Sequence, residues 1–472
     1  MREYNFGHFL YILRSDAGLT QFQLGKLVGV SDKAVSKWEN GVSKPQRDIL
    51  YKLSEVLGVS IDELLSCKYH SCENENVKGV FATRKQLWSK ALDAMHNRYS
   101  EFVPIEILNR FLSEKADIEN TDMIVYFDFL SALVSEAKKN GEHIRIKGGV
   151  ASSFVAYLMG ATEVNPLKPH YYCPDCKRVI FDDRVKSGWD LPSINCSCSK
   201  TMRSDGHGIP FEVYHSDIQR NIALAVDVSP EFLLSAKKCA EEYFKECKIK
   251  TEERDGHICM ITVTTQKSEQ RILFFADDEL AHYKLLEERT ATSFDRVRFD
   301  TADILREFQK GNTDGITEFK STFTKNMLEK VSPSLFNDLI QISGLSHAVG
   351  GWRDNAEALI QQGFSIGETI AYRDDVFNYV RKRMISKGFT DTGFAYKVME
   401  DTRRGVYSKN GIPDEVEHHL RAVGTEDWFV DSVGKIGYLF QKAHGISYVR
   451  TAVILMWYKL HYPKEFNEIM ML

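Results

Sequence analysis

Apolar residues recur every three or four positions through most of this chain, which is the spacing of helices with one buried face. The first such stretch, residues 5–66, divides into five short helices. Its apolar positions are Phe9, Leu10, Ile12, Leu13, Leu24, Leu27, Val28, Val35, Trp38, Ile49, Leu50, Leu53, Val56 and Leu57. The pattern returns over residues 84–140, where a broad stripe predicts further helices. The stripe consists of Ile124, Val125, Phe127, Phe129, Leu130, Leu133 and Val134.

Residues 67–83 interrupt this periodicity. The stretch opens with polar residues and has no repeating apolar face, so we expect a linker between two domains. Cys67, His70 and Cys72 lie within it, but their irregular spacing favours a solvated linker over a metal cluster.

Composition indicates a multidomain globular protein of the cytoplasm. The 472 residues are 43% hydrophobic and 27% charged, which allows a sizeable core and about three domains. The net charge of -5 excludes a uniformly basic nucleic-acid-binding surface, so any DNA contact has to come from local patches. No apolar run approaches the length of about 18 residues that a membrane span needs, and the N-terminus does not begin a signal peptide. Most of the nine cysteines are scattered singly, which suits a reducing compartment.

Residues 18–45 carry the most specific motif. Thr20 stands where an N-cap belongs, Gly29 ends the helix that follows, and Ser31 caps the next helix. Two short helices joined by so tight a turn form a helix-turn-helix, whose second helix enters the major groove of DNA. The domain at residues 5–66 resembles the repressor family typified by lambda Cro and the xenobiotic response regulators. The matching residues are Leu19, Thr20, Gln21, Leu24, Gly25, Val28, Gly29, Val30, Ser31, Val35, Ser36, Lys37, Trp38, Glu39, Asn40, Gly41 and Pro45.

Within this domain we expect core, base-reading and phosphate-binding positions. Val30, Val35 and Trp38 point inward, and the family pattern implies that Glu39 pairs with Arg14. Four side chains of the second helix face away from the core and are expected to reach base edges rather than form only a solvated face: Asp32, Lys33, Ser36 and Lys37. Three more are placed for phosphate oxygens: Gln21, Asn40 and Lys44. Such a domain is expected to bind double-stranded DNA as a homodimer on a palindromic site.

A small-residue turn follows Lys147. Gly148 and Gly149, with Ser152 and Ser153, open onto a helix predicted over residues 154–159. Backbone N–H groups and hydroxyls at such a position form an anion site suited to a triphosphate.

Four cysteines come next in the chain. Cys173 and Cys176 form a CxxC pair, and Cys196 and Cys198 form a CxC pair after a 19-residue loop. Two thiolate pairs on facing turns satisfy a tetrahedral zinc ion, which favours a structural zinc site over four incidental cysteines.

In order and spacing, these motifs resemble the palm and fingers of the PolC-type DNA polymerase III alpha subunit of Gram-positive bacteria. The matching runs are 147–156, 162–167, 205–212, 344–347, 440–444 and 447–449, within an almost continuous match over 315–464. The resemblance implies a multidomain, mostly helical α+β protein with a small mixed palm-like region at 84–310, a zinc ribbon at 170–200 and an all-α fingers-like region at 311–472. It also implies that Lys442 and His444 approach nucleotide phosphates. Arg145 and Ile146 replace a glycine and a serine of the family, which predicts that triphosphate binding is weakened or lost.

The metal-binding carboxylates of the family have no counterparts in this alignment. The family carries two aspartates on one strand and a third on another, and these hold magnesium. Anchoring on Ser229 and Glu231 places Ala223 and Ala225 at the first two positions, on a strand over 222–226. The strand over 271–275 offers Leu273 at the third. We therefore expect no catalytic residue and no magnesium site.

These observations favour a sequence-specific DNA-binding transcriptional regulator with a catalytically inactive polymerase-like sensing module. Its ligand is expected to be a deoxynucleoside triphosphate, primer-template DNA or a replisome protein. One alternative is a small polymerase with relocated metal ligands at Asp227, Asp277 and Asp278. Another is a replisome-docking protein of a mobile or defence element. The resemblance ends near Leu472 and includes no exonuclease, duplex-binding or clamp-binding region, so a processive replicase is not expected.

Overall fold

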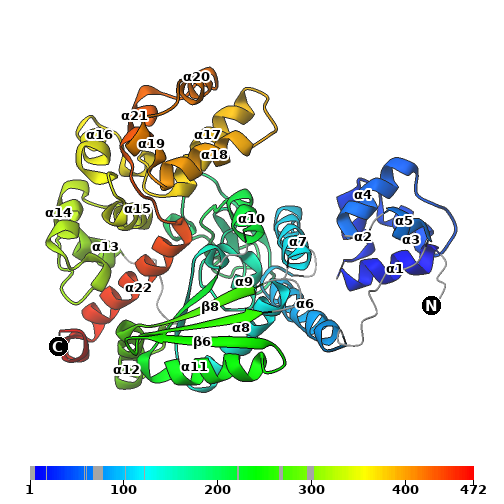
Figure 1. Cartoon of the computed structure of the whole chain (residues 1–472), viewed down its shortest axis with the longest axis horizontal. Helices are drawn as coiled ribbons and strands as arrows, with labels where there is room; N and C mark the ends of the chain where they lie inside the picture. The colour runs from blue at the N-terminus through cyan, green and yellow to red at the C-terminus, as the bar shows by residue number, and fades with distance from the viewer. Residues whose placement is uncertain are drawn as a thin grey trace.

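The structure is a computed structural model that describes residues 6–17, 19–57, 59, 61–66, 78–100, 103–121, 123–220, 223–264, 269–294 and 302–471. It is mostly helical and has two small sheets, so the predicted multidomain α+β fold class is confirmed. Figure 1 shows the N-terminal helices as a group of their own, the helices of the middle of the chain beside the larger sheet, and most of the C-terminal helices in a further lobe.

The N-terminal group contains the five short helices that the periodicity predicts. They are α1 (Phe6–Asp16), α2 (Gln21–Val28), α3 (Asp32–Glu39), α4 (Arg47–Leu57) and α5 (Ile61–Ser66). The apolar stripes meet in a common core, where Leu10, Leu24, Val35 and Leu53 are fully buried. Through this core, α2 packs against both α3 and α4.

The central part is built on a five-stranded sheet of strand order β1-β5-β8-β7-β6. Its strands are β1 (Ile144–Lys147), β5 (Leu224–Val228), β6 (Lys248–Arg254), β7 (Ile258–Thr264) and β8 (Glu269–Ala276). Strands β5 and β8 run parallel, and the other neighbours are antiparallel. The surrounding helices are α6 (Lys78–Tyr99), α7 (Ile105–Asn120), α8 (Ile124–Lys139), α9 (Phe154–Leu158), α10 (Phe211–Gln219), α11 (Pro230–Tyr243) and α12 (Asp278–Thr290).

The two faces of this sheet differ in chemistry. One face carries buried side chains such as Ile146, Val226 and Phe274 and packs against α11, which in turn packs against α8. Successive strand residues point to opposite faces, so the neighbours of these residues lie on the other side. That other face is the one on which the polymerase resemblance places the chemistry, and we call it the open face.

A second, three-stranded sheet holds the predicted zinc ribbon. It consists of β2 (His170–Tyr172), β3 (Val179–Phe181) and β4 (Arg203–Asp205), with β2 in the centre. Its small core contains Tyr171, Leu191 and Met202 together with two of the cysteines.

The C-terminal part is entirely helical. Its helices are α13 (Ala302–Gln309), α14 (Thr322–Val331), α15 (Phe336–His347), α16 (Glu357–Gln361), α17 (Arg373–Ser386), α18 (Gly393–Arg403), α19 (Val406–Asn410), α20 (Asp414–Ala422), α21 (Asp427–Lys435), α22 (Lys442–His461) and α23 (Pro463–Met470). Helix α22 packs against both α13 and α15 and is buried along most of its length. Among the helices that the structure describes, none combines the length and the apolar character needed to cross a bilayer.

Two boundaries differ from the sequence-based expectation. The strand predicted over 222–226 lies at Leu224–Val228, because Asp227 and Val228 continue the pairing with β1. Helix α6 begins at Lys78, so the last residues of the stretch predicted as a linker are helical. Residues 67–77, including Cys67, His70 and Cys72, lie outside the described residues.

Candidate nucleic-acid interface and polymerase-like site

The helix-turn-helix is fixed by local hydrogen bonds that the sequence encodes. The Thr20 hydroxyl accepts from the backbone N–H of Gln23, and the Gln23 side chain accepts from the backbone N–H of Thr20, which forms a capping box. Gly29 ends α2 with a φ of 81°, a conformation that glycine adopts without strain. Ser31 then caps α3 by accepting from the N–H of Ala34.

Helix α3 presents most of the predicted DNA-contacting side chains to solvent. Asp32, Lys33 and Lys37 are exposed, and Ser36 is half-buried. Asn40 and Lys44, beyond its end, are exposed, and the Asn40 amide donates to the backbone oxygen of Ser36 at 2.9 Å. Their DNA contacts remain predictions.

The opposite side of α3 is held by an ion pair. Arg14 Nε donates to Glu39 Oε1 at 2.5 Å, which is the predicted Arg14–Glu39 pair. The Gln21 side chain donates to the other Glu39 oxygen at 2.7 Å. Gln21 therefore helps to position Glu39, and its phosphate contact stays a prediction.

The four predicted cysteine ligands come together. All four sulfurs lie within 4.8 Å of one another, and the two closest pairs, Cys173 with Cys198 and Cys176 with Cys196, are 3.4 Å apart. A tetrahedral zinc with bonds of about 2.3 Å would separate its sulfurs by roughly 3.8 Å. Within the described residues, these four cysteines are the ligating side chains that lie close enough together to hold a metal ion such as zinc.

The small-residue turn after β1 is already occupied by a carboxylate. Glu114 of α7 is fully buried, and its two oxygens accept from the N–H groups of Phe154 and Val155 at 2.9 and 3.1 Å. It also accepts from the Ser153 hydroxyl at 2.7 Å and pairs with Arg110 at 2.5 Å. The N-terminal N–H groups of α9 thus bind the protein's own anion.

The other groups of this turn that are predicted to bind phosphate differ in how accessible they are. The hydroxyls of Ser152 and Ser153 are buried, and Ser152 donates to the Gly149 oxygen at 2.7 Å. Gly148, with a φ of 75°, has open space where a side chain would stand, and Lys147 is half-buried at the edge of the open face. The phosphate contact of Lys147, Gly148, Gly149, Ser152 and Ser153 stays a prediction, and the Ser153 hydroxyl reaches a phosphate only if Glu114 moves.

On the open face, the strand register brings together two of the positions at which the polymerase family carries aspartates. Ala225 of β5 lies beside Leu273 of β8, and Asp227 lies beside Phe275. Across the other edge of β5, Ala225 faces Lys147 and Asp227 faces Arg145. The positions that the alignment assigned to metal ligands therefore carry a methyl group and an isobutyl group, with two cationic side chains next to them.

Lys147 and Arg145 form ion pairs with the carboxylates that lie near them. Lys147 Nζ lies 2.5 Å from Asp227 Oδ1 and 4.1 Å from the centre of the Phe275 ring. Burial raises the pKa of Asp227, while the charges of Lys147 and Arg145 oppose that shift. We call Arg145, Lys147, Asp227, Asp277 and Glu279 the palm charge cluster.

Arg145 is the centre of this cluster. Its guanidinium lies 3.8 Å from Asp227, 3.3 Å from Asp277 and 3.0 Å from Glu279, and it stacks on the Tyr448 ring at 4.6 Å. The arginine thus lies among three carboxylates and joins β1 to α12 and α22.

The two predicted nucleotide-contacting residues of α22 lie in different surroundings. Lys442 is buried; burial lowers its pKa, and its Nζ donates to the backbone oxygen of His207 at 3.2 Å. His444 is half-buried against Phe440 and Tyr448, and burial together with the charges of Lys147 and Arg145 lowers its pKa to about 3. His444 therefore lies near enough to the cations of the palm charge cluster to feel their charge, while the Lys442 amine is engaged elsewhere.

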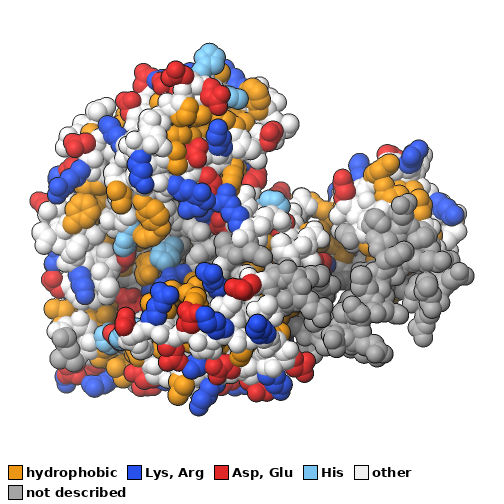
Figure 2. Space-filling view, in the orientation of Figure 1, with side chains coloured by type: hydrophobic (Ala, Val, Ile, Leu, Met, Phe, Trp, Pro, Cys, Tyr) orange, Lys and Arg blue, Asp and Glu red, His pale blue; other side chains and the backbone are white. Residues whose placement is uncertain are grey.

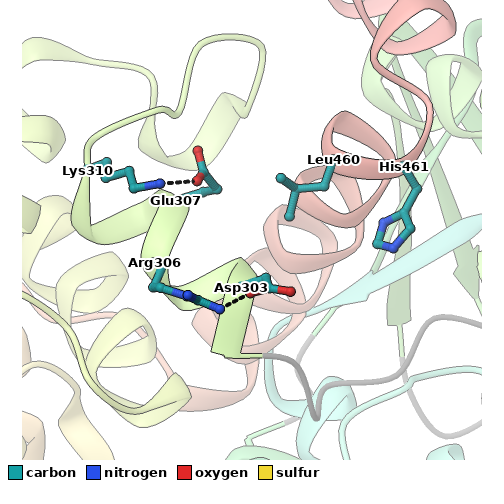
Figure 3. A pocket seen from close by; sticks show the side chains of 6 residues that line it. All are labelled: Asp303, Arg306, Glu307, Lys310, Leu460 and His461. Carbon is teal, nitrogen blue, oxygen red and sulfur yellow. Dashed lines mark hydrogen bonds and ion pairs between the residues drawn. The ribbon is translucent and has the colours of Figure 1, made fainter.

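A polar pocket of about 350 Å³ lies at the far end of α22 (Figure 3). It is lined by Asp303, Arg306, Glu307, Lys310, Leu460 and His461. Its charged groups pair among themselves, Arg306 with Asp303 and Lys310 with Glu307. It is about 28 Å along the helix from Lys442, so it is separate from the polymerase-like site.

Sequence reasoning missed one residue and one residue pairing that shape this site. Glu114 stands 40 positions before its backbone partners, and only the i,i+4 spacing from Arg110 marked it. The pairing of Asp227 with Lys147 depends on the β1–β5 register, which the local pattern does not contain.

Three family descriptions match the chain. Residues 10–64 match a helix-turn-helix family, residues 85–229 the bacterial DNA polymerase III alpha NTPase domain, and residues 280–403 the bacterial DNA polymerase III alpha subunit finger domain. The predicted combination of a Cro/XRE-type helix-turn-helix with polymerase III alpha domains is thereby confirmed.

Similar curated proteins carry the name DNA polymerase III PolC-type. The protein from Thermotoga maritima is 30% identical over 78% of this chain and 33% of its own length. The proteins from Pediococcus pentosaceus and Bacillus cereus are 28% and 29% identical, over 88% and 78% of this chain and 35% and 32% of their own lengths. The chain thus spans about a third of the length of the curated relatives it matches.

Proposed function

We propose that this chain, which joins a Cro/XRE-type helix-turn-helix to polymerase III alpha NTPase and finger domains, is a sequence-specific DNA-binding regulator. In this proposal the helix-turn-helix binds an operator as a homodimer. The polymerase-like part binds a nucleotide or primer-template DNA without extending a primer. The family matches support DNA binding in general, and the regulatory role is our inference.

The observation that carries the proposal is the composition of the palm charge cluster. Two-metal phosphoryl transfer needs carboxylates that bridge both ions. Ala225 and Leu273 cannot ligate a cation, and the nearby carboxylates of Asp227 and Asp277 are paired with Lys147 and Arg145. A metal would have to displace a guanidinium that is 5% exposed, so catalysis is disfavoured.

The exposed side of α3 supports the operator-binding half of the proposal. Asp32, Lys33 and Lys37 are free of the packing that fixes Val35 and Trp38, and they stand on the helix that this fold presents to the major groove. Zinc in the four-cysteine site is proposed to be structural, because four thiolates leave no open coordination position.

The competing hypothesis is a small polymerase with relocated metal ligands. Asp277 and Asp278 would have to serve, since Asp227 is nearly inaccessible at 3% exposure. Asp277 caps α12 and pairs with Arg145 of β1, and Asp278 is the first residue of α12, so a melting curve of each variant is needed beside the activity assay.

Primer extension decides between the two. The full chain is incubated with Mg²⁺ or Mn²⁺, a primer-template and all four deoxynucleoside triphosphates, and binding of the same DNA is followed by fluorescence anisotropy. We expect binding without extension. Robust extension that is lost in Asp277→Ala or Asp278→Ala, and retained in the exposed control Asp431→Ala, would establish the polymerase instead.

A further inference from the structure

Three arginines converge on one carboxylate where α10 approaches α18. Arg220 lies 2.5 Å from Glu400 Oε2, and Arg404 lies 3.1 Å from the same oxygen. Arg403 binds both oxygens, at 2.5 and 3.0 Å. The guanidiniums of Arg403 and Arg220 overcome the effect of burial and lower the pKa of Glu400 to about 2. We call these four residues the arginine cluster.

The cluster holds more positive charge than its acid can neutralise. Arg403 alone satisfies Glu400, so Arg220 and Arg404 are surplus. The other acid that acts on Arg220 is Asp217, which is buried and paired with Arg373. Arg220 and Arg404 cap the C-terminal ends of α10 and α18, and each helix end contributes about half a negative charge. A net charge of about +1 remains after both are counted.

The surplus guanidiniums are also accessible. The Arg220 side chain is 40% exposed and that of Arg404 is 55% exposed, whereas Glu400 is 8% exposed. The Tyr396 ring lies 5.2 Å beneath Arg220 and supports it from the protein side. Figure 2 shows Lys and Arg side chains gathered in this region, where α18 stands over the central part.

We infer that the arginine cluster is a docking site for the phosphodiester groups of a nucleic-acid strand. Guanidinium groups bind phosphate oxygens through paired N–H donors, and a buried carboxylate that orients them keeps that geometry in the absence of ligand. Because Arg220 belongs to the palm-like part and Arg404 to the fingers-like part, a bound strand would cross the junction between them. The inference rests on the proposed function, in that the polymerase-like part binds nucleic acid, and it adds where the strand lies.

The test uses the full chain and a fluorescent single strand of about 20 thymidines, which the duplex-reading helix-turn-helix does not select. The variant is Arg220→Gln/Arg404→Gln, with Arg403 kept so that Glu400 stays paired. The matched control is Arg184→Gln/Arg306→Gln, which removes the same charge at side chains that are 79% and 62% exposed. Binding is measured over a salt series.

Loss of two phosphate contacts should reduce the slope of log K against log salt by about 1.4 and weaken binding on the order of tenfold near 0.1 M salt. The control should keep the wild-type slope. Equal slopes in the variant and the control, with tight wild-type binding, would overturn the site and leave the proposed function standing. If the wild-type chain binds neither the single strand nor a primer-template, the proposed function fails and the inference fails with it.

Discussion

Replacing Glu114 by glutamine tests whether this carboxylate holds the turn after β1 together. The side chain of Glu114 is fully buried and that of its partner Arg110 is 8% exposed, so the substitution leaves an unpaired charge in the interior. Breaking such a buried pair from one side costs about 3–5 kcal/mol. The new amide nitrogen would also face the N–H of Phe154 or Val155, which now donates to a carboxylate oxygen.

Urea unfolding of the full chain gives the measurement. For a slope of about 2–3 kcal/mol/M, the midpoint of the transition that reports on the sheet domain should fall by roughly 1–2 M. The control is Glu119→Gln on the same helix, where the carboxylate is 31% exposed and pairs with Lys115 at 2.9 Å. Its cost should stay below about 0.5 kcal/mol. Equal midpoints for the two variants would refute the assignment of Glu114 as a buried, obligatory anion.

Three further predictions concern the other sites. Lys37→Ala should weaken operator binding by about 1–3 kcal/mol if it reads a base, or lower the salt slope by about 1 if it binds phosphate, while Lys245→Ala leaves gel shifts unchanged. Cys173→Ser and Cys198→Ser should each release metal and lower the melting temperature, whereas Cys239→Ser should not; absence of zinc from protein purified without chelator would refute the site. The Glu318 carboxylate raises the pKa of His347, so this interaction stabilises the fold fully below the unfolded-state value near 6.5 and is lost as pH rises through the folded-state pKa. The melting temperature at pH 6 minus that at pH 8 should therefore be smaller in His347→Gln than in the wild type. The same value in both proteins would count against the pair.

Local signals in the sequence predicted the helix-turn-helix well. Thr20, Gly29 and Ser31 are capping residues whose geometry depends only on their neighbours, and each caps as expected. The cysteine pairs were predictable for the same reason, since each pair lies in its own tight turn.

The polymerase-like site was less predictable because its character depends on distant partners. The loss of carboxylates at Ala225 and Leu273 is visible in the alignment, but the occupation of that space by Arg145 is not. Arg145 meets Glu279 from 134 positions away, and Glu114 reaches α9 from a separate helix. Pattern and spacing describe single elements, whereas these contacts arise when the elements pack.

The palm charge cluster gives the central sheet a built-in counter-ion. Neighbouring carboxylates without a cation repel one another, and a protein that relies on dissolved metal to relieve this repulsion changes stability with metal concentration. Arg145 is covalently part of the chain, so its concentration beside Asp227 and Asp277 never varies. A chelator should consequently loosen the cysteine ribbon and leave the central sheet unaffected, so that two neighbouring parts of one chain respond differently to the same chemical stress.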